Sequence, residues 1–397
     1  MNLFVISTIL TLGNLLASAS YAYQEKDFSV QSSDQINLHL KHYQTKKANQ
    51  FNRKHAVLFI QGQSDATSIA EHFLLDILEN LNLNVVSYDV RGQGLSGGRR
   101  GHVDDFYDHL DDLTKVVKFA REQLQYEHFH FVTHSTGSLI ASLFASLQKS
   151  MLSELSTLTM IAPYFGLPDP PHVSFGIDLI TYSLSFTPVR YWQVPKPGIS
   201  SYLKEDGSMN SFTSDQEMYR SYKDHPDKCG RPTFGWVQAS LEAHRIIEEE
   251  ASKLNLPVLM FTATEDQVVS TPEARKFYDF WEHTSKHNRY IEFANPSQHG
   301  LIYEREKIRK TILASLGEFI DGVSTSSPNI RHNSDSNMYI ADISGSDTRL
   351  NDAKKSKNDI LAPKISRKKS TAQSVFYPAF LFFIPFATFI YFRRRRY

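Results

Sequence analysis

Residues 128–148 read HFHFVTHSTGSLIASLFASLQ, and this stretch decides the fold. Its apolar first part, residues 128–133, predicts a strand, and residues 137–148 predict a helix. Ser135 stands on the turn between the two, where a sharp strand-to-helix turn exposes a serine hydroxyl. Such a turn is crowded and needs a small residue two positions after the serine, which Gly137 supplies. Ser135 is therefore the candidate nucleophile.

Short apolar runs alternate with amphipathic helical runs on both sides of this stretch. A continuous apolar run of about five residues is typical of a buried parallel strand. The alternation predicts an α/β fold, with a mostly parallel sheet covered by helices on both faces, in one large domain over residues 23–321. Residues 164–254 break the rhythm with irregular helical stretches, which predict an inserted helical cap. Strands are predicted at residues 35–43, 56–60, 84–88, 128–133, 158–162, 257–261 and 290–293.

Two further residues complete a catalytic triad with Ser135. Asp266 follows the predicted strand at 257–261, and His299 lies in the loop after the strand at 290–293. The chain order Ser, Asp, His is that of the α/β-hydrolases. Each residue alone also has an ordinary interpretation, as a helix N-cap, a turn former and a loop histidine. Their order after the right strands favours the triad.

A hydrolase of this kind needs two backbone N–H groups to hold the oxyanion. Thr136, directly after Ser135, is expected to supply one of them. Gln63 is expected to supply the other, because it follows Gly62 in the loop after the strand at 56–60. The alternative is that Gly62 only makes a tight turn.

Other chemistries find little support in the sequence. Lys+Arg and Asp+Glu both number 43, so the formal net charge is zero and nothing points to a nucleic-acid partner. His128 and His130 lack a third metal ligand nearby. The run Gly92-Gln93-Gly94 lacks the spacing of a dinucleotide loop. We therefore expect no metal and no cofactor, and we interpret the single cysteine, Cys229, as structural.

Both ends of the chain are predicted to lie outside the fold. Residues 1–22 have an apolar run followed by small residues, which predicts a cleaved signal peptide or, alternatively, an uncleaved anchor or a buried helix. Residues 322–374 are polar and predict a disordered linker. Residues 375–392 carry no charge and predict a transmembrane helix, and the basic tail at 393–397 is expected to stay in the cytoplasm. The catalytic domain is then secreted across the membrane and anchored to it, outside the cytoplasm.

Three motifs resemble the bacterial lysophospholipase and monoacylglycerol lipase-like family of α/β-hydrolases. They are DVRGQGLS at residues 89–96, GHVDDF at 101–106 and NSFTS at 210–214. The resemblance implies a capped, metal-free α/β-hydrolase that acts on acyl esters, and it carries the triad roles over to the three residues named above. The chain departs from the family at Thr133, where glycine is usual, and at Gln61, where many relatives have histidine. We expect Thr133 to crowd the turn, so that exchange for glycine is tolerated or improves activity.

The sequence thus predicts a serine esterase that cleaves lysophospholipids or monoacylglycerols through an acyl-enzyme intermediate. One alternative is a carboxylesterase or peptidase for another small substrate. Another is a catalytically weak binding protein on a hydrolase scaffold.

Overall fold

The computed structural model describes residues 23–47, 49, 51, 53–168, 171–194, 212–294, 297–324 and 338–341. The predicted signal peptide (1–22), membrane span (375–392) and basic tail (393–397) lie outside the described residues. Within the part of the chain that is described, no helix is long and apolar enough to cross a membrane. Of the predicted linker, the structure describes the end of helix α9 (Glu306–Ser324) and strand β9 (Met338–Ala341).

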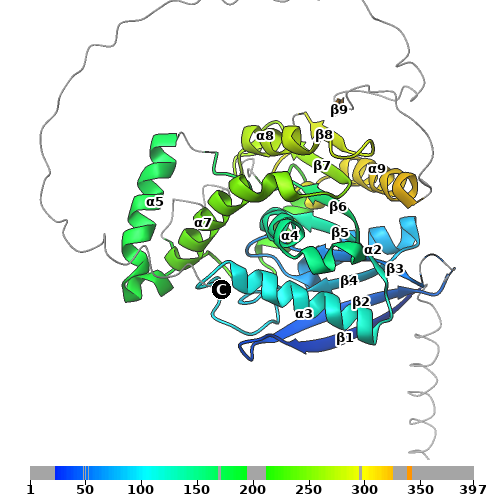
Figure 1. The fold of residues 1–397 in the computed structure, drawn as a ribbon, viewed down its shortest axis with the longest axis horizontal. Helices are drawn as coiled ribbons and strands as arrows, with labels where there is room; N and C mark the ends of the chain where they lie inside the picture. The colour runs from blue at the N-terminus through cyan, green and yellow to red at the C-terminus, as the bar shows by residue number, and fades with distance from the viewer. Residues whose placement is uncertain are drawn as a thin grey trace, which may run out of the picture. The chain divides into compact units, whose positions relative to one another are not determined.

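The described residues build one nine-stranded sheet in the order β1-β2-β4-β3-β5-β6-β7-β8-β9 (Figure 1). Strand β2 runs antiparallel to both of its neighbours, β1 and β4, and every other pair is parallel. The predicted, mostly parallel sheet is therefore confirmed. The strands before β9 are β1 (Tyr23–Gln31), β2 (Asn37–Thr45), β3 (His55–Ile60), β4 (Asn84–Tyr88), β5 (His128–His134), β6 (Leu155–Ile161), β7 (Val258–Ala263) and β8 (Arg289–Phe293).

Strand composition follows position in the sheet. The inner strands β4 and β7 are buried at every residue, as expected of parallel strands covered on both faces. Strand β1 ends the sheet on one side, and most of its residues are exposed. Its sequence, YQEKDFSVQ, has no apolar alternation, which explains why a strand was not predicted there.

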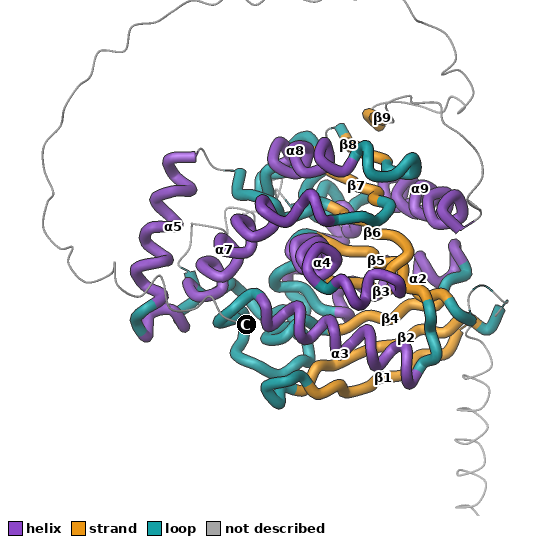
Figure 2. The backbone as a smooth tube through the Cα atoms, viewed as in Figure 1, coloured by secondary structure: helices purple, strands orange, loops and turns teal. Residues whose placement is uncertain are grey.

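Helices cover both faces of the sheet, as predicted (Figure 2). In β3, Ala56, Leu58 and Ile60 belong to one hydrophobic cluster, and Val57 and Phe59 belong to the other. This is the period of two expected of a strand with two buried faces. Helices α3 (Tyr107–Gln123), α4 (Thr136–Leu147) and α8 (Thr271–Trp281) pack into the first cluster, and α2 (Thr67–Leu81) and α9 pack into the second.

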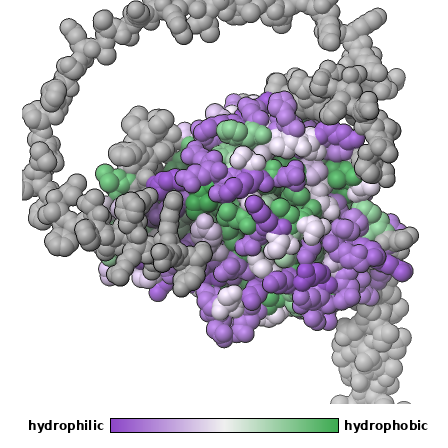
Figure 3. Space-filling view, in the orientation of Figure 1, coloured by the Kyte–Doolittle hydropathy of each residue, from purple (hydrophilic) through white to green (hydrophobic). Residues whose placement is uncertain are grey.

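The described part of residues 164–254 is an insertion between β6 and β7. It contains helices α5 (Pro171–Ser185), α6 (Gln216–Lys223) and α7 (Phe234–Glu250). Helix α7 packs against α4 and supplies Trp236 and Ile247 to the first cluster, so the last part of the insertion joins the core. Helix α5 exposes Leu179 and Ile180. Hydrophilic residues cover much of the face drawn in Figure 3, with hydrophobic patches among them.

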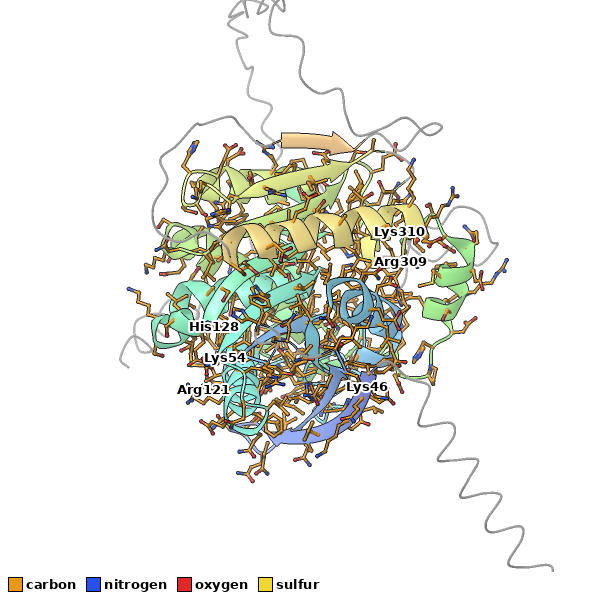
Figure 4. All side chains as sticks on the ribbon, turned by 90° about the vertical axis from the view of Figure 1, so that its right-hand side faces the viewer. Lys46, Lys54, Arg121, His128, Arg309 and Lys310 are labelled. Carbon is orange, nitrogen blue, oxygen red and sulfur yellow. The ribbon has the colours of Figure 1, made fainter. Side chains whose placement is uncertain are left out.

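Histidines gather at one end of the sheet, and burial lowers the pKa of His130 there and of His109 in α3. At the amino ends of β3 and β5, His55 Nδ1 lies 3.1 Å from His130 Nε2, and the rings of His55 and His128 are 4.6 Å apart. Figure 4 shows Lys54 and His128 at this end of the sheet. Burial lowers the pKa of His130 to about 3. Burial in α3 also lowers the pKa of His109 to about 3, and neither of its ring nitrogens has a hydrogen-bond partner among the described residues.

We expect the protein to lose stability as the pH falls below about 6.5. A histidine in the unfolded chain takes up a proton near pH 6.5, whereas His109 and His130 in the fold resist protonation until about pH 3. Each should therefore lower the free energy of unfolding by about 2 kcal/mol between pH 7 and pH 5. Urea unfolding at the two pH values measures this loss.

The matched variants are His109→Leu and His283→Leu, because His283 is exposed. The first should reduce the loss between pH 7 and pH 5, and the second should leave it unchanged. An equal loss in the wild type and in His109→Leu would show that His109 is not part of the acid sensitivity.

Candidate active site

Ser135 occupies the sharp turn between β5 and α4. Its backbone has φ 51° and ψ −118°, a region that residues other than glycine rarely adopt. Three backbone hydrogen bonds hold it there. Ser135 N–H donates to the Ile161 carbonyl at 3.0 Å, and the Ser135 carbonyl accepts from Ser138 N–H at 3.0 Å and from Tyr164 N–H at 3.2 Å. A strained residue held by its surroundings is typical of a nucleophile on such a turn.

Glycine at position 137 makes this turn possible. A Cβ atom on Gly137 would lie 2.1 Å from the carbonyl oxygen of Ile60 and 2.8 Å from that of Gln61. Both atoms belong to the backbone of β3 and its following loop, which cannot move without displacing the sheet. This steric conflict explains why the sequence analysis expected a small residue at this position.

The structure brings the three predicted triad residues into one hydrogen-bonded chain. His299 Nε2 lies 3.0 Å from Ser135 Oγ, and His299 Nδ1 lies 2.8 Å from Asp266 Oδ2. Because the carboxylate accepts the Nδ1–H, the Nε2 lone pair faces the serine hydroxyl. The other carboxylate oxygen, Oδ1, accepts the backbone N–H groups of Val268 at 2.8 Å and Val269 at 2.9 Å. The side chains of His299 and Asp266 are 5% and 1% exposed, so water is largely excluded from their contact.

Both predicted oxyanion residues line the same cavity as the serine. Gln63 follows Gly62 in the loop after β3, and Thr136 opens helix α4. The N–H groups of a first helical turn have no acceptor within the helix, so the N–H of Thr136 is available to a ligand. A Cβ atom on Gly62 would lie 3.1 Å from Ser135 Cβ, so glycine brings this loop close to the nucleophile.

A buried carboxylate below the site was missed by the sequence analysis. Asp65 accepts the Tyr303 hydroxyl at 2.6 and 2.8 Å, and Asp65 Oδ2 lies 3.7 Å from His134 Nδ1. Gln61 Nε2 donates to the Asp65 carbonyl at 3.0 Å, so the residue that replaces the family's histidine shapes this loop. Residues 65 and 303 are far apart in the chain, and no local pattern announces their contact.

Glu304 is a second residue that the sequence analysis missed. It is fully buried, and burial raises the pKa of its carboxyl group. It accepts the backbone N–H of Gln298, next to His299, at 2.9 Å, and that of Ser214, from the insertion, at 3.0 Å. Glu304 therefore connects the insertion with the loop that contains His299.

Thr133 makes buried hydrogen bonds that our expectation of crowding did not include. It is fully buried, and its hydroxyl lies 2.8 Å from the Ser138 hydroxyl and donates to the Thr159 carbonyl at 3.0 Å. Threonine thus fills its site and ties β5 to both α4 and β6.

Thr133→Gly should therefore be harmful and not tolerated as first expected. Loss of the buried hydroxyl contacts should lower the free energy of unfolding by about 1–3 kcal/mol. Thr133→Ser, which keeps the hydroxyl, should lower the free energy of unfolding by a smaller amount. Urea unfolding of the two variants beside the wild type measures the difference, and equal stability of Thr133→Gly and the wild type would restore the crowding argument.

The serine and histidine open into a cavity of about 210 Å³. Its apolar lining includes Leu167, Trp236 and Val269, and its polar lining includes Asp65 and Lys228. The arrangement can therefore receive a molecule with one apolar and one polar end. In the described ranges, no group of three or more His, Cys, Asp or Glu side chains is placed to hold a metal ion.

Comparison with known proteins gives consistent matches. The family model described as serine aminopeptidase, S33, matches residues 52–306. The probable lysophospholipase L2 of Haemophilus influenzae is 23% identical over 247 residues, which cover 60% of this chain and 75% of the relative. Lysophospholipase L2 of Escherichia coli K12 is 24% identical over 274 residues, which cover 65% of this chain and 76% of the relative.

The fold also matches solved structures. A soluble variant of monoglyceride lipase from Saccharomyces cerevisiae, in complex with a substrate analog, has a TM-score of 0.59 and 19% identity. The match covers 76% of this chain and 96% of that chain. The predicted α/β-hydrolase fold is therefore confirmed.

Proposed function

The chain belongs to the serine aminopeptidase S33 family, and on that premise we propose that it cleaves the acyl ester of lysophospholipids or monoacylglycerols through an acyl-enzyme intermediate. Family membership and the lysophospholipase relatives make it a serine esterase-type hydrolase. The observation that carries the finer proposal is the Ser135–His299–Asp266 chain of hydrogen bonds at the wall of a partly apolar cavity.

The proposed reaction begins with attack of Ser135 Oγ on the acyl carbonyl carbon. His299 Nε2 takes the hydroxyl proton and returns it to the departing alcohol oxygen as the ester bond breaks. Water then gives a proton to His299 and attacks the acyl-serine, which releases the fatty acid and restores the serine. Asp266 holds the imidazole in the required tautomer and stabilises its charged form.

The oxyanion that forms in both steps is expected to lie between the backbone N–H groups of Gln63 and Thr136. Donors fixed in advance at this position lower the barrier because they need no rearrangement as charge develops. Both residues line the cavity beside Ser135, which supports the assignment.

The substrate proposal draws on the relatives and on the cavity. Proteins named lysophospholipase L2 and monoglyceride lipase are similar to this chain. Both names refer to substrates that are acyl esters of a glycerol-based alcohol. The apolar lining, which includes Leu167, Trp236 and Val269, suits an acyl chain. The family description also names an aminopeptidase, so a peptide substrate is the second candidate.

One experiment separates these possibilities. The purified protein is treated with a fluorophosphonate probe and assayed on a lysophospholipid, a monoacylglycerol, a p-nitrophenyl butyrate and an aminoacyl anilide. We expect covalent labelling and preferential hydrolysis of the two lipid esters. Labelling with activity on the anilide alone would favour the peptidase, and absence of labelling would favour a binding protein.

We also propose, from residues 1–22 and 375–392 alone, that the enzyme acts outside the cytoplasm while attached to a membrane. Fractionation of native cells tests this, because an attached enzyme stays with the membranes after an alkaline carbonate wash. Recovery in the wash would remove the proposal.

A further inference from the structure

Lys228 lies on the cavity wall close to the reacting residues. Its Nζ is 3.8 Å from the centroid of the Tyr222 ring, which stacks on Phe212 at 4.2 Å. The Phe212 ring in turn lies 6.3 Å from the His299 ring. All four residues line the same cavity as Ser135, so a molecule whose ester lies at the serine shares this cavity with the lysine.

Among the described residues, the ammonium group of Lys228 forms no direct ion pair. No acidic side chain of the described residues lies within ion-pair distance of it, and its nearest aromatic neighbour offers only a ring face. Burial lowers the pKa of Lys228 to about 8, because removal from water disfavours the charged form. The negative charges of Asp65 and Asp224 offset only part of this effect, so Lys228 is a partly dehydrated cation without a carboxylate in direct contact among the described residues.

The other charged groups of the cavity are already engaged. Asp65, its one carboxylate among the described lining residues, accepts both contacts from the Tyr303 hydroxyl and one from the Ala66 N–H. Arg231 donates to the Val194 carbonyl at 2.7 Å and adds a second positive charge to the lining. The polar side of the cavity is consequently positive, and it matches an anion.

We propose that Lys228 selects acyl esters whose alcohol part carries a negatively charged phosphate, and so favours lysophospholipids over monoacylglycerols. The inference rests on the proposed function and names the substrate class of the same site. The acyl chain lies against the apolar residues, the carbonyl carbon lies at Ser135, and the phosphate oxygens accept from the Lys228 ammonium. A charge-assisted bond in a partly desolvated site is stronger than the contact that a neutral glycerol hydroxyl can make.

The test compares two esters with the same octanoyl chain, an octanoyl lysophosphatidylglycerol and a monooctanoylglycerol, both below their critical micelle concentrations. The measured quantity is the ratio of kcat/KM for the phosphate ester to kcat/KM for the neutral ester. Lys228→Met should lower this ratio about tenfold or more, mainly through KM of the phosphate ester. Lys228→Arg, which keeps the positive charge, should retain most of the wild-type ratio.

Lys223→Met is the matched control, because Lys223 is an exposed lysine at the end of α6 outside the cavity lining. It should leave the ratio unchanged. A folding check on each variant by urea unfolding excludes a general loss of structure. An unchanged ratio in Lys228→Met, or an equal fall in Lys223→Met, overturns the proposal.

Further arms separate this inference from the proposed function and from binding of a free anion. Hydrolysis of both lipids by the wild type with an unaltered ratio in Lys228→Met overturns the role of Lys228 alone. If the wild type hydrolyses p-nitrophenyl butyrate but neither of the two lipids, the proposed substrates and this inference are overturned together. Inorganic phosphate could instead inhibit the enzyme through Lys228 while the enzyme shows no preference for the phosphate ester. That result would assign the site to a free anion and would also overturn the inference.

Discussion

Exchange of Ser135 for alanine is expected to reduce ester hydrolysis by roughly four to six orders of magnitude in a protein that still folds. The reaction loses the oxygen that forms the acyl-enzyme bond, and no other hydroxyl in the described structure bonds to His299 Nε2. The fold should survive, because the hydrogen bonds that hold the turn come from the backbone of residue 135. Hydrolysis of p-nitrophenyl butyrate at saturating substrate measures the loss, and fluorophosphonate labelling should disappear with it.

Ser146→Ala is the matched control for this variant. Ser146 lies in α4 with a buried hydroxyl that has no hydrogen-bond partner among the described residues, so the same exchange there should leave activity and stability close to wild type. Activity within tenfold of wild type in Ser135→Ala would refute the nucleophile assignment.

Exchange of Gly137 for alanine should destroy activity by a different route. The new Cβ would lie 2.1 Å from the Ile60 carbonyl oxygen, so β3 and α4 must move apart or the turn must change its path. Either change displaces Ser135 from His299. We expect the free energy of unfolding to fall by about 3 kcal/mol or more, and hydrolysis to fall at least a hundredfold in any folded fraction.

Gly176→Ala is the control, because a Cβ placed on Gly176 in α5 meets no described atom within 4 Å beyond its chain neighbours and its own helix backbone. That variant should keep full activity and should be unchanged or slightly more stable, since alanine favours a helix. Urea unfolding and the p-nitrophenyl butyrate assay measure both variants. Wild-type behaviour of Gly137→Ala would mean that the turn has more room than the structure describes.

The sequence predicted those features that depend on local periodicity. Buried strands such as β3 and β5 are short apolar runs. Ser135, Asp266 and His299 each follow such a run, so their place beyond the carboxyl ends of the strands could be expected. The polar strand β1 has no such signature and was missed.

The remainder of the site arises from contacts between distant segments. Asp65 meets Tyr303, and Glu304 meets Ser214, across long stretches of the chain. Lys228 meets Tyr222 nearby in the chain, but in a part of the insertion without regular periodicity. Thr133 was misjudged for the same reason, because its two hydroxyl contacts come from α4 and β6 and not from its own strand. Burial and hydrogen-bond partners of this kind follow from tertiary packing, which composition and spacing do not encode.

Strand β1 has a consequence for how copies of the protein meet one another. It is the last strand on its side of the described sheet, and an edge strand can pair with a strand from a second molecule. Glu25, Lys26 and Asp27 stand exposed along that edge. A second strand that paired there would bring its own side chains against this row of charges. Charged residues on an edge strand disfavour such edge-to-edge association, so we expect β1 to oppose aggregation at high concentration.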